Sequence, residues 1–218
     1  DGSTDSTLKI LNKYKNEIKI LNLVKNMGIG YGRNLSIKES KNNLVAALDA
    51  DVVPDKKWLF NMYNSMIKNK SHLCGGLLIE KYSKSNRYNY WREIHIMHKF
   101  KKKIVTDVQS FITGSNMLLN KSTWIKVGGF DEQFRTNGED VNFCIKLRTD
   151  GYKISYDSEA YCYHLQNDNL QSLLNRCWRY YISGTGLKKP TYKRLMLRSI
   201  KHFKYCLINS FKDLIHLR

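Results

Sequence analysis

The sequence predicts an α/β layer fold with a largely parallel sheet. Through about the first eighty of its 218 residues, helical and strand patterns alternate. Two short apolar runs, at residues 44–48 and 73–79, have the length of strands, and residues 58–68 between them carry apolar side chains at helical spacing. Such alternation is typical of parallel strands joined by crossover helices.

Local signals support each element in turn. The chain opens on turn residues at 1–5, with an N-cap candidate before the first helix. In chain order we expect a helix at 8–16, a strand at 18–23, a glycine-rich loop at 28–32, a helix at 33–41, a strand at 44–48, a helix at 58–68 and a strand at 73–79. Farther on we expect an apolar stretch at 111–119, a helix at 139–150, strands at 153–156 and 160–164, and helices from residue 170 onward.

The most informative motif follows the run at 44–48, which we expect to be a buried strand. Asp49 and Asp51 are separated by one residue, and strand side chains alternate between faces, so the two carboxylates point to one side. Two carboxylates on one side repel each other unless a cation lies between them, and oxygen ligands suit Mg²⁺ or Mn²⁺. The alternative is a polar strand end followed by a turn at Pro54 and Asp55.

A second group of acidic residues opens the helix predicted at 139–150. Glu139 and Asp140 begin this helix, where the helix dipole favours ionised carboxylates, although acidic residues also serve as helix caps. His164 closes an apolar strand. A histidine in that position is usually structural, and it gains a functional meaning only if it meets the aspartate pair.

Two glycine positions indicate close backbone approaches. The loop at 28–32 lacks the spacing of a dinucleotide-binding loop, but a tight loop here would give Arg33 access to a phosphate. Gly114 interrupts the apolar stretch at 111–119, which indicates a bulge or a close approach of the backbone to another group.

The charge balance is strongly basic, with 37 Lys and Arg against 19 Asp and Glu, a net charge of +18. No nucleic-acid-binding module accompanies this charge, so we expect no specific nucleic-acid partner. An anionic membrane surface or a phosphate-bearing ligand would suit it, and AT-rich coding would also produce it. The five cysteines include no C-x-x-C pair, which argues against a zinc finger or disulfide framework and favours a cytoplasmic protein.

The last part of the sequence, residues 170–218, is predicted to be a basic helical extension to a domain at residues 1–169. Its apolar residues recur at three- and four-residue steps: Ile200, Phe203, Leu207, Phe211 and Leu214. Lysines and arginines fill the positions between them, and such a helix can lie peripherally on the anionic inner face of the cell membrane. The alternative is a helix docked on its own domain.

Six short motifs follow one another in a definite order: Asp-Gly-Ser-Thr-Asp, Gly-Arg-Asn, Asp-Ala-Asp, Gly-Gly-Phe-Asp-Glu, Gly-Glu-Asp-Val and a strand ending in His. In this order they resemble the family 2 glycosyltransferases of the GT-A fold, over roughly residues 1–185. The resemblance implies a Rossmann-like mixed sheet sandwiched by helices. It also implies a nucleotide-diphosphate sugar donor, usually a UDP-sugar, and Mn²⁺ or Mg²⁺ as cofactor.

The same resemblance implies roles for individual residues. The donor-binding residues would be Asp1 at the base, Arg33 at the phosphates or ribose, Asp49, Asp51 and Asn116. The cation would be held by Asp49, Asp51 and His164. Asp140 would be the catalytic base.

These residue types suit an inverting transfer, in which an acceptor hydroxyl displaces the diphosphate at the anomeric carbon in one step. The carboxylate of Asp140 would take the proton of the attacking hydroxyl. A cation and nearby basic groups would neutralise the leaving diphosphate. We expect the acceptor to be a saccharide or a lipid-linked saccharide in the synthesis of a bacterial cell-surface polysaccharide.

The sequence departs from the family pattern at both ends. The first strand of the family fold and the helix and strand after it are missing, so we expect an N-terminally truncated domain. The alternative function is therefore a non-catalytic relative that acts as a membrane-associated scaffold. Gln171, Arg176 and Trp178 lack the Gln-x-x-Arg-Trp spacing, which favours transfer of single sugars over processive synthesis. Trp178, Tyr180 and Tyr181 would either line an acceptor site or pack into the core.

Overall fold

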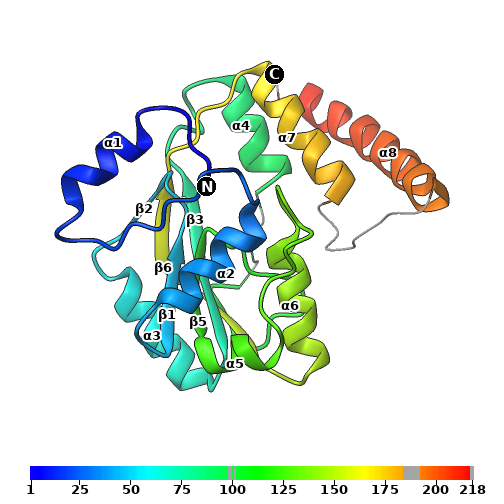
Figure 1. The fold of residues 1–218 in the computed structure, drawn as a ribbon. Helices are drawn as coiled ribbons and strands as arrows, with labels where there is room; N and C mark the ends of the chain where they lie inside the picture. The colour runs from blue at the N-terminus through cyan, green and yellow to red at the C-terminus, as the bar shows by residue number, and fades with distance from the viewer. Residues whose placement is uncertain (98–99, 101, 184–191, 217–218) are drawn as a thin grey trace. The chain divides into compact units, whose positions relative to one another are not determined.

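The structure is a computed structural model that describes residues 1–97, 100, 102–183 and 192–216 (Figure 1). The chain divides into two compact units, residues 1–186 and 187–218. The helix Leu170–Ser183 (α7) is therefore grouped with the first unit, whereas the sequence predicts a boundary between residues 169 and 170.

Helices and strands alternate through most of the first unit. The helices are α1 (Thr7–Leu11), the 3₁₀-helix η1 (Asn12–Tyr14), α2 (Ile29–Glu39), α3 (Trp58–Asn69), α4 (Arg87–His95), α5 (Lys121–Lys126), α6 (Glu139–Thr149) and α7. The strands are β1 (Leu44–Leu48), β2 (Val52–Pro54), β3 (Leu73–Glu80), β4 (Ile104–Val105), β5 (Asn116–Asn120) and β6 (Ile154–His164). The second unit contains one described helix, α8 (Tyr192–His216).

The central sheet is mixed, as the family resemblance implies. Its strand order is β1-β5-β3-β6-β2, and β4 pairs with β6. β1, β3 and β6 run in one direction, but β5 lies between β1 and β3 and is antiparallel to both. The prediction of a largely parallel sheet was therefore wrong: among the described strands, β3 and β6 form the one parallel pair. The order of helices and strands along the sequence does not reveal the direction of a strand, so the antiparallel β5 could not be predicted from it.

The two faces of the sheet have separate hydrophobic cores. Leu73 and Cys74 are neighbours in β3 and are both fully buried, but they belong to different cores because strand side chains alternate. One core packs the sheet against α3, through Trp58, Met62 and Met66. The other packs it against α2 and α6, through Ile37, Phe143 and Leu147. Figure 1 shows the sheet lying between α3 and α6.

A buried hydrogen bond ties α3 to the sheet. Asn116, at the start of β5, is fully buried. Its Oδ1 accepts a hydrogen bond from the indole Nε1 of Trp58 at 2.7 Å, and its Nδ2 donates to the carbonyl oxygen of Leu77 at 3.1 Å. The amide thus provides a partner for the buried indole N–H of Trp58 and for the part-buried carbonyl of Leu77.

Two expectations about the first fifty residues were wrong. Residues 18–23 form no strand, and Ile18 is exposed, because no described strand provides ladder partners for this segment. β1 is half-buried rather than buried, since among the described strands it pairs with β5 alone.

The helix predicted at 33–41 begins earlier, at Ile29, so the glycine-rich segment forms its first turn. Gly28 precedes the helix with φ of +98°, a backbone conformation that favours glycine. The backbone N–H groups of Ile29 and Gly30 then donate to the carbonyl oxygens of Arg135 and Phe134. A distant loop therefore satisfies the free N–H groups at the start of α2, which no local pattern could indicate.

The strands predicted at 153–156 and 160–164 form one continuous strand, β6. Its pairing with β3 shifts register between Gly76 and Leu78, and this irregularity accommodates the polar residues between the two predicted segments.

None of the described helices combines the length and the apolar composition that crossing a bilayer requires.

We expect Asn116→Ala to lower the free energy of unfolding by roughly 1–3 kcal/mol, because it leaves the Trp58 indole N–H buried without its partner and removes the bond to the part-buried Leu77 carbonyl. Urea unfolding followed by tryptophan fluorescence measures this loss. Ser36→Ala, which removes an exposed hydroxyl bond within α2, serves as the control and should change stability by less than about 0.5 kcal/mol. An equal loss in both variants would contradict the assignment.

Candidate active site

An arginine bridges two carboxylates at the end of β1. Arg33, from α2, donates from Nη2 to Oδ1 of Asp49 at 3.0 Å and from Nη1 to Oε1 of Glu139 at the start of α6. The side chains of Arg33 and Glu139 are almost completely buried, whereas that of Asp49 is 42% exposed. The Arg33 guanidinium also lies over the Phe130 ring, 5.9 Å from its centroid. A fixed positive charge therefore stands beside a solvent-accessible carboxylate.

Gly114 gives Arg33 its space, as the sequence predicts for a close backbone approach. A β-carbon at Gly114 would overlap the guanidinium of Arg33. On its other side, the backbone N–H of Gly114 donates to Oδ2 of Asp140 at 3.0 Å. The loop before β5 thus brings Arg33 and Asp140 to neighbouring positions.

Asp140 lies in the first turn of α6 and is partly exposed. Besides the bond from Gly114, its Oδ1 accepts from the backbone N–H of Val141 at 2.8 Å. The helix N-terminus favours a negative charge at this position. Asp140 is therefore an anchored carboxylate at the surface of the site, whereas its neighbour Glu139 is buried and bound to Arg33.

Sheet pairing brings Asp51 and His164 together. His164 ends β6, where it lies in register with Val52 of β2 and Glu80 of β3. Its Nε2 is 3.3 Å from Oδ2 of Asp51, which is 44% exposed, and its Nδ1 is 2.6 Å from Oε1 of Glu80, which is fully buried. A carboxylate accepts but does not donate, so Nδ1 carries a proton and donates it to Glu80.

The two carboxylates control the charge of this histidine. Burial by itself lowers the pKa of His164, but the hydrogen bonds to Asp51 and Glu80 outweigh that effect and raise the pKa to about 9. The hydrogen bond from His164 in turn holds the pKa of Asp51 below its usual value. In this structure Asp51 and His164 therefore form an ion pair.

The two aspartates of the pair thus have different partners, Arg33 for Asp49 and His164 for Asp51. Within the described ranges, no group of three or more His, Cys, Asp and Glu side chains is placed to hold a metal ion. The carboxylate of Asp51 and the imidazole of His164 are nevertheless ligand types that fit Mn²⁺, and Nε2 is the ring nitrogen that faces Asp51. The site residues therefore fit a divalent cation through this part of the expected ligand set.

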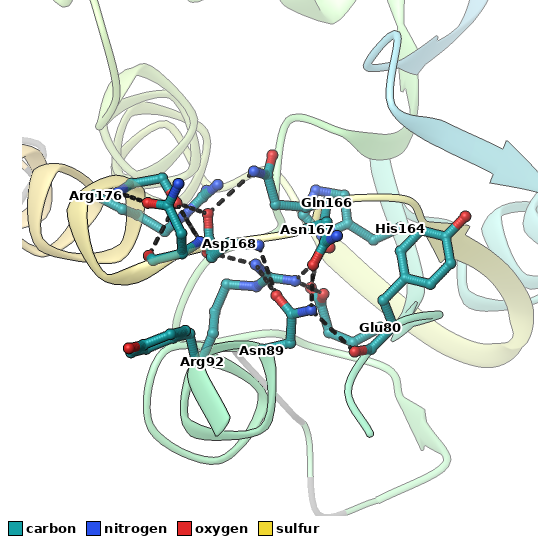
Figure 2. A network of polar contacts seen from close by, with 12 residues as sticks. Glu80, Asn89, Arg92, His164, Gln166, Asn167, Asp168 and Arg176 are labelled. Atoms are coloured by element: carbon teal, nitrogen blue, oxygen red, sulfur yellow. Dashed lines mark hydrogen bonds and ion pairs between the residues drawn. The ribbon is translucent and has the colours of Figure 1, made fainter. Parts of the chain in front are cut away.

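Behind His164 lies a buried polar network that sequence reasoning missed (Figure 2). The side chains of Glu80, Arg92 and Asp168 are fully buried, and Arg92 donates from Nη2 to Glu80 and from Nη1 to Oδ2 of Asp168 at 2.5 Å. Burial lowers the pKa of Arg92, but its bonds to the two carboxylates more than compensate and raise it. The sequence contained one signal for Glu80: this carboxylate ends the apolar strand β3, just as the carboxylate of Asp49 directly follows β1. Nothing local marks Arg92 or Asp168.

A cavity of about 480 Å³ opens beside this network. It is lined by Gln166, Asp168, Ser172, Asn175, Arg176, Trp178 and Arg179. Trp178, which the sequence places at an acceptor site or in the core, is 62% exposed. Tyr180 does not belong to the lining, and the side chain of Tyr181 lies outside the part of the chain that the structure describes.

The side chains of Asp1 and Asn116 bond to groups other than the site side chains described above, although Asn116 lies opposite Leu48, the residue before Asp49, in the sheet. Asp1 accepts hydrogen bonds from the backbone N–H groups of Met27 and Gly28, at 2.6 and 3.0 Å, and so shapes the entry into α2. Asn116 lies in the interior, where Trp58 and Leu77 occupy its amide. We therefore assign Asn116 a packing role.

The N-terminal part of the chain, residues 1–128, matches the family model described as Glycosyl transferase family 2. The chain is also similar to the poly-beta-1,6-N-acetyl-D-glucosamine synthases of Staphylococcus aureus, at 26% identity, and Staphylococcus epidermidis, at 27% identity, each over 201 residues. Each match covers 84% of this chain and 46% of the relative, so the chain spans about half the length of the curated relatives it matches.

Solved structures share the fold. TarS 1–349 from S. aureus in complex with UDP-GlcNAc superimposes with a TM-score of 0.57 at 21% identity, covering 78% of this chain and 48% of that one. The mannosyltransferase PcManGT from Pyrobaculum calidifontis, in complex with GDP-Man and Mn²⁺, gives 0.61 at 14% identity, covering 91% and 52%. These likenesses confirm the expected fold class.

We expect Gly114→Ala to destabilise the protein by about 1–3 kcal/mol, because the added methyl group forces the Arg33 guanidinium away from Asp49 and Glu139. Chemical denaturation of the purified chain measures the change.

Gly32→Ala is the matched control for this variant. Gly32 lies in α2, where an added β-carbon meets no atom within 4 Å, so the substitution should raise stability by about 0.5–1 kcal/mol. If Gly114→Ala were as stable as the starting chain, the position of the Arg33 guanidinium would not depend on the absence of a side chain at residue 114.

Proposed function

Because the chain belongs to glycosyl transferase family 2, we propose that the protein moves a sugar from a nucleotide-diphosphate sugar to an acceptor hydroxyl. The observation that carries this proposal is the placement of Asp140 and Arg33 on either side of Gly114, with Asp49 beside Arg33. An anchored carboxylate able to take a proton thus stands next to a fixed positive charge able to face a phosphate.

UDP-sugars are the donors we propose, and UDP-N-acetylglucosamine is the first to test. TarS has been solved with UDP-GlcNAc, and the staphylococcal relatives are named as synthases of an N-acetylglucosamine polymer. Arg33 supports an anionic donor, since Asp49 and Glu139 hold its positive charge in place and a guanidinium has N–H donors beyond these two bonds. Asp1 would contact the base, as the family resemblance implies.

Mn²⁺ or Mg²⁺ would be held by Asp51 and His164, with Asp49 as the further ligand that the resemblance implies. Divalent cations of this kind commonly take substrate phosphates as additional ligands, which suits a site with few protein groups. The bound cation would supply charge neutralisation for the departing diphosphate.

The transfer itself needs one base. The acceptor oxygen forms a bond to the anomeric carbon while the bond from that carbon to the diphosphate oxygen breaks, which inverts the configuration. The proton of the acceptor hydroxyl passes to a carboxylate oxygen of Asp140, and the nucleoside diphosphate leaves with the bonding electrons. Arg33 stabilises the negative charge of the leaving group.

The cavity beside α7 is our proposed acceptor site. Its lining combines an exposed indole, Trp178, with amide, hydroxyl and guanidinium groups. An aromatic face together with planar hydrogen-bonding groups suits a saccharide, whether free or lipid-linked. We propose a role in cell-surface polysaccharide synthesis at the cytoplasmic side, with transfer of single sugars as the sequence favours.

α8 supports peripheral binding to an anionic membrane. Ile200, Phe203, Leu207 and Phe211 recur at three- and four-residue steps and are all exposed. Lys193, Lys201 and Lys204 are exposed on the same helix. Exposed apolar and basic side chains on one helix are typical of segments that lie in the headgroup region of a bilayer.

We expect Asp140→Asn to reduce sugar transfer by roughly 100- to 10,000-fold, because the amide cannot take the proton of the acceptor. Turnover with UDP-N-acetylglucosamine is followed by UDP release. Calorimetry should show that binding of UDP with Mn²⁺ is unchanged.

The matched control is Asp150→Asn, at the opposite end of the same helix, which should leave turnover unchanged. Unchanged turnover in Asp140→Asn would exclude Asp140 as the base. If the unaltered chain gave no metal-dependent heat with UDP, the scaffold function would be favoured instead.

We expect the chain to sediment with vesicles that contain phosphatidylglycerol and not with vesicles of phosphatidylcholine alone. Phe203→Gln should weaken this binding by roughly tenfold to 100-fold, because a large apolar side chain no longer enters the bilayer.

Tyr205→Gln is the control, since residue 205 lies on the opposite side of α8 and should change binding by less than about twofold. Equal losses in the two variants, or no binding to anionic vesicles, would favour a helix that docks on protein.

A further inference from the structure

Glu80 is a buried carboxylate that the reaction described above does not use. It ends β3 directly beside His164 in the parallel register of the sheet, and its side chain is fully buried. The backbone N–H of Lys81 donates to the carbonyl oxygen of His164 at 3.1 Å, so the two strand ends are also joined through the main chain. Glu80 and His164 therefore have little freedom to move apart.

The two oxygens of Glu80 have different partners. Oε1 accepts from Nδ1 of His164, and Oε2 accepts from Nη2 of Arg92 (Figure 2). A carboxylate bound at both oxygens cannot rotate, so the direction of its bond to the imidazole is fixed.

Arg92 is itself held on several sides. Its Nη2 also donates to the carbonyl oxygen of Gln166 at 3.0 Å, and its Nη1 donates to Asp168 at 2.5 Å. Asp168 is fixed in turn by its backbone N–H, which donates to Oδ1 of Asn89 at 2.7 Å, and by the hydroxyl of Ser172, which donates to its Oδ1 at 2.8 Å. The guanidinium therefore anchors Glu80 to a framework formed by α4 and the segment that enters α7.

The consequence for His164 is geometric. With Nδ1 donating to Glu80, the ring has one orientation, and Nε2 points to the side where Asp51 lies at 3.3 Å. A buried carboxylate that binds the far nitrogen of a histidine is the arrangement that orients imidazole ligands toward metal ions in proteins.

We propose that Glu80, anchored by Arg92, is a positioning residue that orients His164 so that Nε2 and the Asp51 carboxylate together face a divalent cation. The inference rests on the proposed function, because the cation belongs to the donor site described above. Glu80 does not contact the cation or the reacting atoms, and it acts through the ring of His164.

The test is Mn²⁺ binding by the full chain, with the free ion counted by electron paramagnetic resonance, in the presence of UDP. Glu80→Gln should weaken Mn²⁺ binding by roughly tenfold to 100-fold, since loss of such an outer partner typically has this effect on metal affinity. Glu80→Asp is the second variant. The shorter aspartate keeps the negative charge that pairs with Arg92, but its carboxylate no longer reaches Nδ1 of His164. We therefore expect this variant to remain folded and to bind Mn²⁺ more weakly.

Ser155→Ala is the matched control. Ser155 is a fully buried residue of the same strand, and its hydroxyl bonds that of Ser71 at 2.6 Å. In the register with β3, Ser155 and His164 lie opposite Cys74 and Glu80, so the two are roughly 20 Å apart along the sheet. It should lower stability without changing Mn²⁺ affinity, because it removes a buried hydrogen bond that has no part in the site.

Weaker Mn²⁺ binding in both Glu80 variants, with unchanged binding in Ser155→Ala, supports the proposal. Binding by either folded Glu80 variant within about twofold of the starting chain overturns it and leaves the proposed function intact. An equal loss in Ser155→Ala, or loss of the folded state in both Glu80 variants, assigns Glu80 to stability alone and also overturns it. If the starting chain does not bind Mn²⁺ in the presence of UDP, both the proposed donor site and the positioning role of Glu80 are overturned.

Discussion

Two guanidinium groups, that of Arg92 fully buried and that of Arg33 largely buried, each bridge a pair of carboxylates where the candidate site lies. Arg33 joins Asp49 to Glu139, and Arg92 joins Glu80 to Asp168. Without them, several negative charges would gather near the ends of β1 and β3 and at the start of α6. Removing one partner of a buried ion pair typically costs about 3–5 kcal/mol, because the remaining charge has no compensation. The carboxylates of the site can therefore lie close together only because the two arginines compensate their negative charge.

The same arrangement divides the site into two parts. Asp49, Arg33 and Asp140 meet around Gly114, whereas Asp51 and His164 meet at the end of β6. Ala50 alone separates the two aspartates in the chain, so the parts are covalently adjacent. The proposed donor, with a diphosphate at its centre, suits such a division, since one part offers a guanidinium and the other contains the residues proposed to hold a cation.

Sequence reasoning succeeded where the signal was local. The strand at Leu44–Leu48 and the helices at Trp58–Asn69 and Glu139–Thr149 were found within one or two residues, because their apolar spacing is contained in the segment itself. The close approach at Gly114 was also found from its place in an apolar stretch. The order of short motifs identified the family, which the match over residues 1–128 confirms. The early start of α2 was missed because its first N–H groups bond to residues 134 and 135, more than a hundred positions away.

By itself, the sequence determined which residue types could carry the chemistry and which helices and strands would present them. Only the tertiary structure decided how they pair: Asp49 with Arg33, Asp51 with His164, and Glu80 with both His164 and Arg92. It also decided that β5 runs against its neighbours and that Asn116 belongs to the interior. The physical reason is range. Helix and strand propensities act over a few neighbouring residues, whereas the partner of a buried charge is set by the packing of the whole sheet, which brings together side chains 12 to 113 positions apart.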